Sequence, residues 1–512
     1  MLVKTFGSAI YGVNAYIVTV EVSVEPGVNF TIVGLPDNAV KESQQRVESA
    51  LHQCGFHIPG KKVVINMAPA DIRKEGAAYD LTLAIGILAA NGDINNERID
   101  QYLIMGELSL DGSLRPIKGV LPIAIEARRK SFKGIILPMD NVREAAIVNN
   151  LEVYGAGHIS QVIGFLNGDC QLERVEFDTR EEFAKSLNQY EFDFSDVKGQ
   201  EEVKRALEIA AAGGHNVIMI GAPGSGKSML AKRLPSILPP LSLEESLETT
   251  QIYSVAGKMK KEDALIAVRP FRSPHHSISD VGLCGGSSKP LPGEISLAHN
   301  GVLFLDELPE FKRSTLEILR QPMEERKVTI SRAAMSVDYP SSFQLIAAMN
   351  PCPCGYYNHP TQECTCHPGQ VNKYLGRISG PLLDRIDIHL EVLPLTPKEL
   401  ASKQPGESST TIRERVVAAR RIQAERFKDA PGVHCNAQMT TKLFQKYCAI
   451  DSSCQQIMAQ AMERLGLSAR AYDRILKVAR TIADLEGAPM IKNSHISEAI
   501  TYRSLDRDSW GK

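Results

Sequence analysis

The sequence predicts an α/β protein of about three domains, and three observations lead to this prediction. A chain of 512 residues corresponds to about three domains at roughly 150 residues each. After residue 196, short and strongly apolar strands alternate with helical patterns, as in a parallel sheet covered by helices on both faces. Residues 1–170 mix strand and helix patterns of their own, and residues 412–506 are helical.

The composition is that of an ordinary folded protein. Hydrophobic residues make up 43% of the chain and charged residues 23%, which excludes a disordered or collagen-like chain. The formal net charge of −2 gives no whole-molecule attraction to nucleic acid, so any polyanion must be bound by local patches. The first residues lack a secretory signal pattern, and no apolar run approaches about 18 residues. We therefore expect a cytoplasmic protein with no membrane partner.

Residues 1–170 are expected to form an α+β domain. Residues 15–24 are rich in β-branched side chains and end at a Glu-Pro-Gly turn, which predicts a strand. Residues 37–53 predict a helix with Asp37 as its N-cap. Shorter strand and helix patterns follow at residues 63–67 and 79–90.

The rest of the chain divides into a sheet-containing core and a helical end. The core, residues 196–395, contains three apolar strands at residues 216–220, 301–305 and 343–348. Polar segments without a sustained apolar period predict linkers on either side of the core, at residues 171–195 and 396–411. The helical end, residues 412–506, has helix-period apolar residues at 412–427, 453–465 and 469–485.

A phosphate-binding motif follows the first core strand. The pattern G-x-x-x-x-G-K-[ST] is matched by Gly221, Ala222, Pro223, Gly224, Ser225, Gly226, Lys227 and Ser228. Glycines let backbone N–H groups surround phosphate oxygens, Lys227 supplies a cation to the β- and γ-phosphates, and Ser228 can bind Mg²⁺. The motif lies between an apolar strand and a helix, a context that a chance glycine-rich turn lacks. The sequence therefore predicts an ATP and Mg²⁺ site.

A second motif predicts that the nucleotide is hydrolysed. The apolar strand at 301–305 ends in Asp306 and Glu307. In P-loop ATPases, an Asp at this place holds Mg²⁺ through water, and the following Glu orients or deprotonates the attacking water. Any buried strand can end in acids, so the prediction depends on the phosphate-binding loop upstream.

Four of the ten cysteines lie close together in a loop. The scattered six are Cys54, Cys170, Cys284, Cys435, Cys448 and Cys454, and the clustered four are Cys352, Cys354, Cys364 and Cys366. Four thiolates suit a closed, tetrahedral, structural Zn²⁺ site, and His359 or His367 is an alternative ligand. The C-x-C spacing is tighter than the usual C-x-x-C, so free thiols or a redox pair remain the alternative.

Several strings resemble AAA+ ATPases. Residues Asp196–Gln200 before the phosphate loop, the Asp306-Glu307 pair, and Ala348–Asn350 carry this resemblance, with Asn350 at the sensor-1 position. Residues Leu382–Asp387 resemble the segment that holds the arginine finger in the magnesium-chelatase and MCM branch. Residues Ser468–Arg470 resemble the sensor-2 position of that branch.

Nearly the whole chain resembles the YifB/ComM group of Mg-chelatase-like ATPases, most clearly at residues 269–276, 352–355 and 469–474. The resemblance implies a ring, expected to be a homo-hexamer, with nucleotide between subunits. Arg385 would then reach into the neighbour's site as the arginine finger, a contribution of several kcal/mol in P-loop enzymes. Arg470 would act as sensor 2. Arg377 is the second candidate for the finger, and intramolecular salt bridges are the alternative for these arginines.

Two places in the core are candidates for contacting DNA. The 78 positions from Ser228 to Asp306 indicate an insertion, and residues 326–332 predict one arm of a hairpin that returns at 337–339. In the magnesium-chelatase and MCM branch, these places hold loops that project into the ring channel. The candidate phosphate-backbone contacts are therefore Arg272, Lys289, Lys327 and Arg332, with solvated surface charge as the alternative.

The amino-terminal domain resembles the proteolytic domain of Lon-type proteases, a ribosomal S5 domain 2-like fold. The resemblance lies at residues 105–119 and 134–138, and Lys74–Ala78 resembles the segment that presents the nucleophile. Such enzymes need a Ser activated by a Lys. Ala78 stands at the Ser position and Leu121 at the Lys position, while Lys118 is three residues away. We expect the fold to be kept and peptide hydrolysis to be lost.

The sequence therefore predicts a ring-forming motor on single-stranded, forked or branched DNA. The resemblance implies helicase or branch-migration activity in homologous recombination and natural transformation, with recombination proteins as further partners. The alternatives are a magnesium-chelatase-type subunit that remodels a protein partner, and a nucleotide-gated scaffold. The Lon-like domain and the cysteine loop fit a chelatase poorly, Glu307 and Asn350 argue against a scaffold, and Ala78 and Leu121 argue against an ATP-dependent protease.

Overall fold

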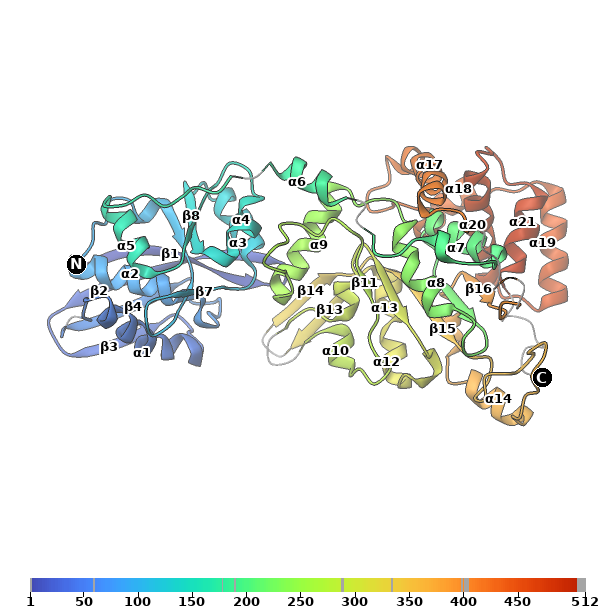
Figure 1. Cartoon of the computed structure of the whole chain (residues 1–512), viewed down its shortest axis with the longest axis horizontal. Helices are drawn as coiled ribbons and strands as arrows, with labels where there is room; N and C mark the ends of the chain where they lie inside the picture. The colour runs from blue at the N-terminus through green and yellow to red at the C-terminus, as the bar shows by residue number, and fades with distance from the viewer. Residues whose placement is uncertain are drawn as a thin grey trace.

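The computed structural model describes residues 2–503 except residues 59, 177, 188–189, 287–289, 333–334, 397–398 and 400–404. Figure 1 shows an elongated molecule with a sheet domain at the amino-terminal end, a second sheet in the middle and a cluster of helices at the far end. The predicted α/β class, with a parallel-sheet core and carboxy-terminal helices, is confirmed. Within the described residues, no helix is both long enough and apolar enough to cross a membrane.

The first sheet has seven strands in the order β3-β4-β2-β1-β5-β8-β9. Its strands are β1 (Leu2–Tyr11), β2 (Asn14–Glu25), β3 (Asn29–Val33), β4 (Lys62–Ala68), β5 (Tyr102–Ile104), β8 (Gly134–Pro138) and β9 (Glu152–Ala156). A separate small ribbon pairs β6 (Glu107–Leu108) with β7 (Leu114–Arg115). The antiparallel β1–β2 hairpin lies at the centre, so the predicted strands at 15–24 and 63–67 are confirmed as β2 and β4.

Five helices accompany this sheet: α1 (Asn38–Gln53), α2 (Asp80–Asn91), α3 (Val120–Arg129), α4 (Val142–Ala146) and α5 (Ile159–Asn167). The predicted N-cap of α1 is confirmed, because the Asp37 carboxylate accepts a hydrogen bond of 2.8 Å from the Val40 N–H. Val40, Val47 and Leu51 share the buried face of α1, and α2 is buried over nearly its whole length. The apolar spacing of these segments therefore predicts both the helices and their buried faces.

The first predicted linker contains a helix. Residues Thr179–Ser186 form α6, and the Asp178 side chain accepts hydrogen bonds from the Arg180 and Glu181 N–H groups. The segment has an N-cap signal but too few apolar residues for a sustained period, which explains why periodicity did not reveal the helix.

The second sheet has five parallel strands in the order β11-β12-β15-β10-β16. They are β10 (Val217–Ile220), β11 (Phe271–Arg272), β12 (Val302–Leu305), β15 (Gln344–Met349) and β16 (Ile388–Glu391). The strands predicted at 216–220, 301–305 and 343–348 are confirmed. All residues of β10, β12 and β15 are buried, as expected for strands covered on both faces.

Short helices and a hairpin surround the second sheet. The helices are α7 (Glu201–Gly213), α8 (Lys227–Arg233), α9 (Leu243–Ala256), α10 (Asp280–Cys284), α11 (Glu294–Leu297), α12 (Arg313–Ile318), α13 (Arg320–Glu325), α14 (Pro368–Leu375) and α15 (Gly380–Leu383). The predicted hairpin is confirmed as β13 (Lys327–Arg332) and β14 (Met335–Pro340), with Lys327 opposite Pro340. The carboxyl ends of the parallel strands share one edge, which positions the site described below.

The carboxy-terminal helices are α17 (Ser409–Phe427), α18 (Thr441–Tyr447), α19 (Ser452–Leu465), α20 (Ala469–Leu485) and α21 (Asn493–Thr501). The helix predicted at 469–485 has the same bounds as α20, while α17 begins at Ser409, inside the second predicted linker. The Ser408 side chain caps α17 by accepting from the Thr411 N–H. Figure 1 shows these helices grouped beside α7, and α20 and α17 both contact α7.

The amino-terminal domain is hydrogen-bonded to the middle of the chain at α9 and at β14. The Gly119 N–H, at the start of α3, donates to the Ser254 carbonyl of α9 at 3.0 Å. At the tip of the β1–β2 hairpin, the Tyr11 hydroxyl donates to the Ser336 carbonyl of β14 at 2.7 Å. Helix α9, which lies between Ser228 and Asp306, and the β13–β14 hairpin therefore both contact the first domain.

Candidate active site

The phosphate-binding loop connects the end of β10 to the start of α8. Gly224 and Gly226 have φ values of +78° and +91°, which L side chains rarely adopt. At Gly221, a Cβ atom would lie 2.3 Å from the Val392 carbonyl oxygen, so only glycine fits beside β16. Gln200, from the string that resembles AAA+ proteins, donates to the Ser225 carbonyl at 2.9 Å. The loop is thus held in a curled shape that presents backbone N–H groups, as phosphate binding requires.

Lys227 lies at the carboxyl edge of the five-stranded sheet, between the ends of β10 and β15. Its ammonium donates to the carbonyls of Gly221 and Ala222 at 2.7 and 2.9 Å and to the Asn350 side-chain oxygen at 3.3 Å. Burial lowers the pKa of Lys227, and the nearby Asp306 carboxylate opposes this shift. Asn350 follows β15 directly, so the predicted sensor 1 and the loop lysine are brought together.

The predicted magnesium ligands also meet. The Ser228 hydroxyl donates to the Asp306 carboxylate at 2.6 Å, and Asp306 directly follows β12. A hydroxyl and a carboxylate are oxygen ligands of the kind that Mg²⁺ prefers. These two residues fit a divalent cation bound with nucleotide at this edge.

Glu307 is held in an unusual backbone conformation and has a partner that the sequence did not reveal. Its φ is +52°, and its N–H donates to the Asp306 carboxylate at 2.9 Å. Its own carboxylate lies 3.2 Å from Nδ1 of His276. Because β11 runs parallel to β12, the residues that follow β11 reach the same edge as Glu307. Strand pairing is the signal that could have predicted this contact, and a two-residue strand is too short to be recognised in sequence.

Arg385 and Arg470 lie at the opposite edge of the sheet. In β16, Ile388 pairs with Val217 and Glu391 pairs with Ile220, so Arg385 precedes the amino ends of both strands. The phosphate-binding loop follows their carboxyl ends. Arg470 donates to Asp384 at 3.1 Å, which places it beside Arg385. Neither arginine is brought to the phosphate-binding loop of its own chain.

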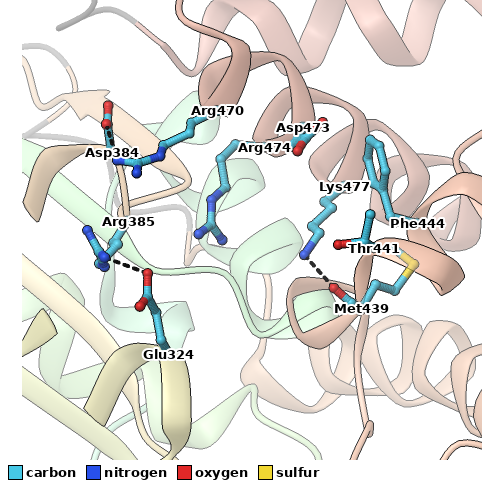
Figure 2. A pocket seen from close by; sticks show the side chains of 10 residues that line it. All are labelled: Glu324, Asp384, Arg385, Met439, Thr441, Phe444, Arg470, Asp473, Arg474 and Lys477. Atoms are coloured by element: carbon cyan, nitrogen blue, oxygen red, sulfur yellow. Dashed lines mark hydrogen bonds and ion pairs between the residues drawn. The ribbon is translucent and has the colours of Figure 1, made fainter. Parts of the chain in front are cut away.

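Figure 2 shows that these arginines line a charged pocket between the sheet domain and the carboxy-terminal helices. Its charged residues are Glu324, Asp384, Arg385, Arg470, Asp473, Arg474 and Lys477. Arg385 forms an ion pair of 2.5 Å with Glu324, and only 11% of its side chain is exposed. Arg470 is 66% exposed. The predicted finger is therefore held by an intramolecular ion pair, the alternative anticipated for it.

Arg377, the second candidate for the finger, is held near its own acidic strand. It donates to the Pro309 carbonyl at 3.1 Å and to the Glu310 carboxylate at 2.9 Å, three residues after Glu307. Arg377 therefore lies near the carboxyl edge of the five-stranded sheet, whereas Arg385 lies near its amino edge.

The four clustered thiols meet in the loop that follows Asn350. Cys352, Cys354 and Cys364 have sulfur–sulfur distances of 3.3, 3.6 and 3.7 Å, and the four sulfurs, including Cys366, lie within 4.8 Å of one another. A tetrahedral Zn²⁺ with Zn–S bonds of about 2.3 Å would place its sulfurs about 3.8 Å apart. The donor set and its spacing therefore fit a closed zinc site.

The surroundings of the cluster favour one thiolate among the four, because the neighbouring cysteines raise the pKa of Cys364 and of Cys366. All four thiols are free. Burial opposes ionisation of Cys354, but hydrogen bonds from the Tyr356 backbone and the Cys352 thiol lower its pKa to about 5. His359, one alternative ligand, instead accepts backbone hydrogen bonds from Thr361 and Gln362. The loop also contacts the phosphate-binding loop, because a Cβ at Gly355 would lie 2.6 Å from Cδ of Pro223.

Comparison with known proteins places the chain in a family. A family model described as magnesium chelatase, subunit ChlI, matches residues 193–400. Models described as subunit ChlI of Mg-chelatase and as the ChlI C-terminal part match residues 20–141 and 406–503. YifB of Escherichia coli (strain K12) is 46% identical over 502 residues, which cover 98% of this chain and 96% of YifB. The chain belongs to the YifB/ComM family of magnesium-chelatase-like proteins.

Two further relatives show how far this YifB/ComM-family similarity extends. Competence protein ComM of Haemophilus influenzae is 43% identical over 510 residues, covering 99% of this chain and 98% of ComM. Magnesium-chelatase subunit ChlI of Euglena gracilis is 24% identical over 263 residues, covering 45% of this chain and 71% of that subunit. Membership of the family suggests an ATPase that uses ATP and Mg²⁺, and the converging residues at the carboxyl edge agree with this.

The candidate DNA contacts of this YifB/ComM-family chain differ in their surroundings. Arg272 makes a bidentate ion pair with Glu294, at 2.6 and 2.8 Å. Lys327 pairs with Asp338 across the β13–β14 hairpin at 3.0 Å and is 48% exposed. Arg332 ends β13, and Lys289 lies outside the described residues. The roles of these residues in contacting DNA remain predictions.

The two positions that would carry protease chemistry have no reactive group. Ala78 lies in the turn before α2, and Leu121 is buried in α3. The Leu121 N–H donates to the Glu144 carboxylate at 2.9 Å and to the Ser254 hydroxyl at 3.4 Å. The start of α3 therefore contacts α9 in this YifB/ComM-family chain.

Proposed function

We propose that this chain is an ATP-hydrolysing AAA+ motor whose active site is completed by a neighbouring copy in a ring, expected to be a homo-hexamer. One observation supports this most strongly. Lys227, Ser228, Asp306, Glu307 and Asn350 converge at the carboxyl edge of the sheet, while Arg385 and Arg470 lie at the opposite edge. In a head-to-tail ring, the amino edge of one subunit faces the nucleotide of the next. The finger arginine would then stabilise the charge on the transferred phosphate.

The residues of the site have distinct proposed roles. The loop from Gly221 to Ser228 binds the phosphates of ATP, and Ser228 and Asp306 bind Mg²⁺. Glu307 orients or deprotonates the attacking water, and Asn350 holds the γ-phosphate side of the site from β15. From the neighbour, Arg385 contacts the phosphate and Arg470 acts as sensor 2.

The proposed substrate is single-stranded, forked or branched DNA. The motor would promote branch migration or unwinding in homologous recombination and natural transformation, in the cytoplasm and with recombination proteins as partners. The full-length similarity to competence protein ComM supports a role in competence. The proposed contacts to the phosphate backbone are Arg272, Lys289, Lys327 and Arg332. Because these contacts read no bases, binding would be independent of sequence and sensitive to salt.

The second candidate function is a magnesium-chelatase-type ATPase that remodels a protein partner. It is favoured by the matches to the ChlI models, which span both sheet-containing parts and the helical end. The chelatase subunit of Euglena gracilis, however, aligns with only 45% of this chain, whereas ComM aligns with 99%. The DNA motor is therefore the preferred proposal. A nucleotide-gated scaffold would not need Glu307 and Asn350, because it does not hydrolyse ATP.

We further propose a domain organisation and a structural metal. Residues 1–170 form a Lon-like domain without peptidase activity, 171–195 a linker, 196–395 the AAA+ core, 396–411 a second linker and 412–506 a helical lid. Cys352, Cys354, Cys364 and Cys366 would hold Zn²⁺ with a closed shell, which supplies cross-linking of the loop and no catalysis.

ATP turnover with and without DNA tests the proposed substrate. We expect single-stranded or forked DNA to stimulate phosphate release, and we expect the stimulation to fade as salt rises, because contacts to backbone phosphates release counterions. A Lys327→Gln variant should lose part of the stimulation and keep the DNA-free rate. An absence of response to DNA at any salt concentration would favour the chelatase-type alternative.

A further inference from the structure

Residues 324–327 connect the proposed arginine finger with the β13–β14 hairpin. Glu324 lies in the last turn of α13 and forms the ion pair of 2.5 Å with Arg385. Arg326 alone separates α13 from β13, and Lys327 is the first residue of β13. The partner of the proposed finger and a candidate DNA contact are therefore three residues apart in the chain.

Arg326 holds the end of α13 and the base of the hairpin together. Its carbonyl accepts a hydrogen bond of 2.8 Å from the Ser341 N–H, directly after β14. Its guanidinium donates to the carbonyls of Gly432 and Gln438, between α17 and α18, at 2.6 and 3.4 Å. Its φ is +55°, a value that few residues other than glycine adopt, so these contacts hold the turn in its shape. The hairpin and α13 therefore meet at one well-held turn.

Arg385 is turned inward in this structure. Figure 2 shows Glu324 directed at Arg385 inside the charged pocket. Arg385 also donates to the Pro381 carbonyl at 2.6 Å, and its side chain is only 11% exposed. Within the described residues, its Nε atom is buried and has no hydrogen-bond partner. A guanidinium that binds a phosphate held by another chain needs its N–H groups directed outward. Arg385 therefore has to leave Glu324 before it acts on a neighbour's nucleotide.

We propose that Glu324 is a positioning residue that withholds Arg385 from the neighbouring site, and that the β13–β14 hairpin releases Arg385 when it binds DNA. The inference rests on the proposed roles of Arg385 as the finger and of the hairpin as a DNA contact. A DNA phosphate that takes Lys327 from Asp338 displaces β13, and the turn at Arg326 passes this displacement to the last turn of α13. Glu324 then moves away from Arg385. Because Glu324 is 56% exposed, water solvates its carboxylate once the pair opens.

The test compares ATP turnover of the full chain carrying Glu324→Ala with that of the wild type, with and without single-stranded DNA. Protein concentrations are chosen at which turnover per chain no longer depends on concentration, so that differences in assembly do not contribute. The DNA-free kcat should rise about two- to fivefold, the shift that loss of a half-exposed ion pair allows. The KM for ATP should stay within about twofold, because the phosphate-binding loop is unchanged, and the stimulation ratio should fall toward one.

Two further variants control for the loss of charge and for the site of substitution. Glu324→Gln keeps an accepting oxygen without the charge, so its DNA-free rate should lie between those of the wild type and Glu324→Ala. Glu325→Gln changes the next residue of α13, whose carboxylate accepts a hydrogen bond of 2.9 Å from Gln321. It is the matched control and should behave as the wild type.

A double variant shows whether the gain in turnover depends on Arg385. Glu324→Ala should add no turnover to an Arg385→Gln chain, because the side chain that it releases is absent there. The same relative gain in both backgrounds would show that Glu324 acts by another route and would overturn the inference.

The remaining outcomes separate this inference from the proposed function. A DNA-free rate of Glu324→Ala at or below the wild-type rate overturns it, provided that the melting temperature shows a folded chain. If Glu324→Ala fails to fold, Glu324→Gln decides by the same comparison. A raised DNA-free rate with the full stimulation ratio retained overturns the release by the hairpin. Wild-type turnover by Arg385→Gln would instead overturn the finger. Wild-type turnover unaffected by DNA would overturn the DNA motor, while the DNA-free comparison would still test the effect of Glu324 on Arg385.

Discussion

At the scale of single residues, the proposed phosphate and magnesium ligands at the carboxyl edge are hydrogen-bonded to neighbouring groups. Lys227 is bonded to two carbonyls and to Asn350, and Ser228 is bonded to Asp306. These contacts hold the Lys227 ammonium and the proposed magnesium ligands, Ser228 and Asp306, in place before ATP binds. Preorganisation of this kind lowers the cost of ordering the site during catalysis.

The roles of Lys227 and Glu307 predict different defects. Lys227→Ala should abolish nucleotide binding, since it removes the cation that meets the β- and γ-phosphates. Glu307→Gln should bind ATP normally and lose at least about 100-fold in turnover, the usual contribution of a general base. Calorimetry gives the binding, and phosphate release gives the rate. Glu310→Gln, three residues away and paired with Arg377, is the control and should turn over ATP.

The sequence predicts residues of this site when they belong to one continuous motif at a strand end. The phosphate loop, Asp306 and Asn350 are of this kind, and all of them meet in the structure. His276 and Glu324 reach their partners from segments far away in the chain, through the pairing of β11 with β12 and through the packing of α13. Such contacts depend on tertiary structure, which no local spacing encodes.

At the scale of elements, the cysteine loop connects sensor 1 with the phosphate-binding loop. It begins two residues after Asn350 and contacts Pro223 through Gly355. An ordered loop would therefore support both sides of the nucleotide site. The proposed Zn²⁺ would therefore affect ATP turnover only by ordering the cysteine loop.

Metal analysis tests the proposed zinc site. We expect about one Zn²⁺ per chain in the purified protein, with tight tetrahedral thiolate coordination. Double substitution of Cys354 and Cys364 by Ser should remove the metal and lower the melting temperature, since metal binding stabilises only the folded loop. Cys170→Ser, at an exposed cysteine outside the cluster, should retain the metal. Only a trace of zinc in the wild type would return the cluster to free thiols or a redox pair.

A buried ion pair joins β16 to helix α20. The Asp387 carboxylate, which is 1% exposed, accepts from Arg474 at 2.9 Å and from the Asn216 N–H at 3.1 Å. Burial alone would raise the pKa of Asp387, but the Arg474 guanidinium and His215 hold it well below its usual value. The ion pair therefore contributes to the attachment of the helical end.

Asp387→Asn should lower the free energy of unfolding by about 3 kcal/mol, the low end for breaking a buried pair, because Arg474 is 25% exposed. The folded-state pKa lies below the unfolded value of about 3.9, so this contribution is complete above about pH 4 and is lost as pH falls further. In urea unfolding, the difference in the free energy of unfolding between variant and wild type should be constant from pH 7 to about pH 5. The difference should become smaller below about pH 4. A difference that already shrinks near pH 6 would contradict this assignment.

Helices were predictable in proportion to their length and apolar period. Helix α20 has a strong apolar face, and its spacing predicts the observed bounds. Helices α6, α18 and α21 have seven to nine residues, and no spacing predicts their bounds, although α18 and α21 lie within residues 412–506, which are predicted to be helical. Short helices present too few turns for a period to be recognised, and their formation depends on caps and on packing against longer elements.

At the scale of the whole molecule, the amino-terminal domain is joined to the parts of the core that carry the candidate DNA contacts. It meets α9 of the insertion through Gly119, Leu121 and Ser254, and it meets the β13–β14 hairpin through Tyr11. These contacts agree with the structural role that we propose for the amino-terminal domain.

The two edges of the core sheet predict that a working site needs two chains. Glu307→Gln disables the carboxyl edge of a subunit and leaves its Arg385 intact, while Arg385→Gln does the reverse. Each variant alone should therefore lose most of its ATP turnover. Arg377→Gln is the matched control, because Arg377 is bound to Pro309 and Glu310 of its own chain.

Subunit mixing tests this claim most directly. Glu307→Gln and Arg385→Gln chains, co-expressed in equal amounts with different tags and purified through both, should regain about a quarter of the wild-type rate, because about one interface in four then has both residues intact. Melting temperatures near that of the wild type would show that both variants are folded. A mixed assembly with no more activity than either variant alone, or an Arg385→Gln chain that turns over ATP at the wild-type rate, would contradict a site shared between neighbours.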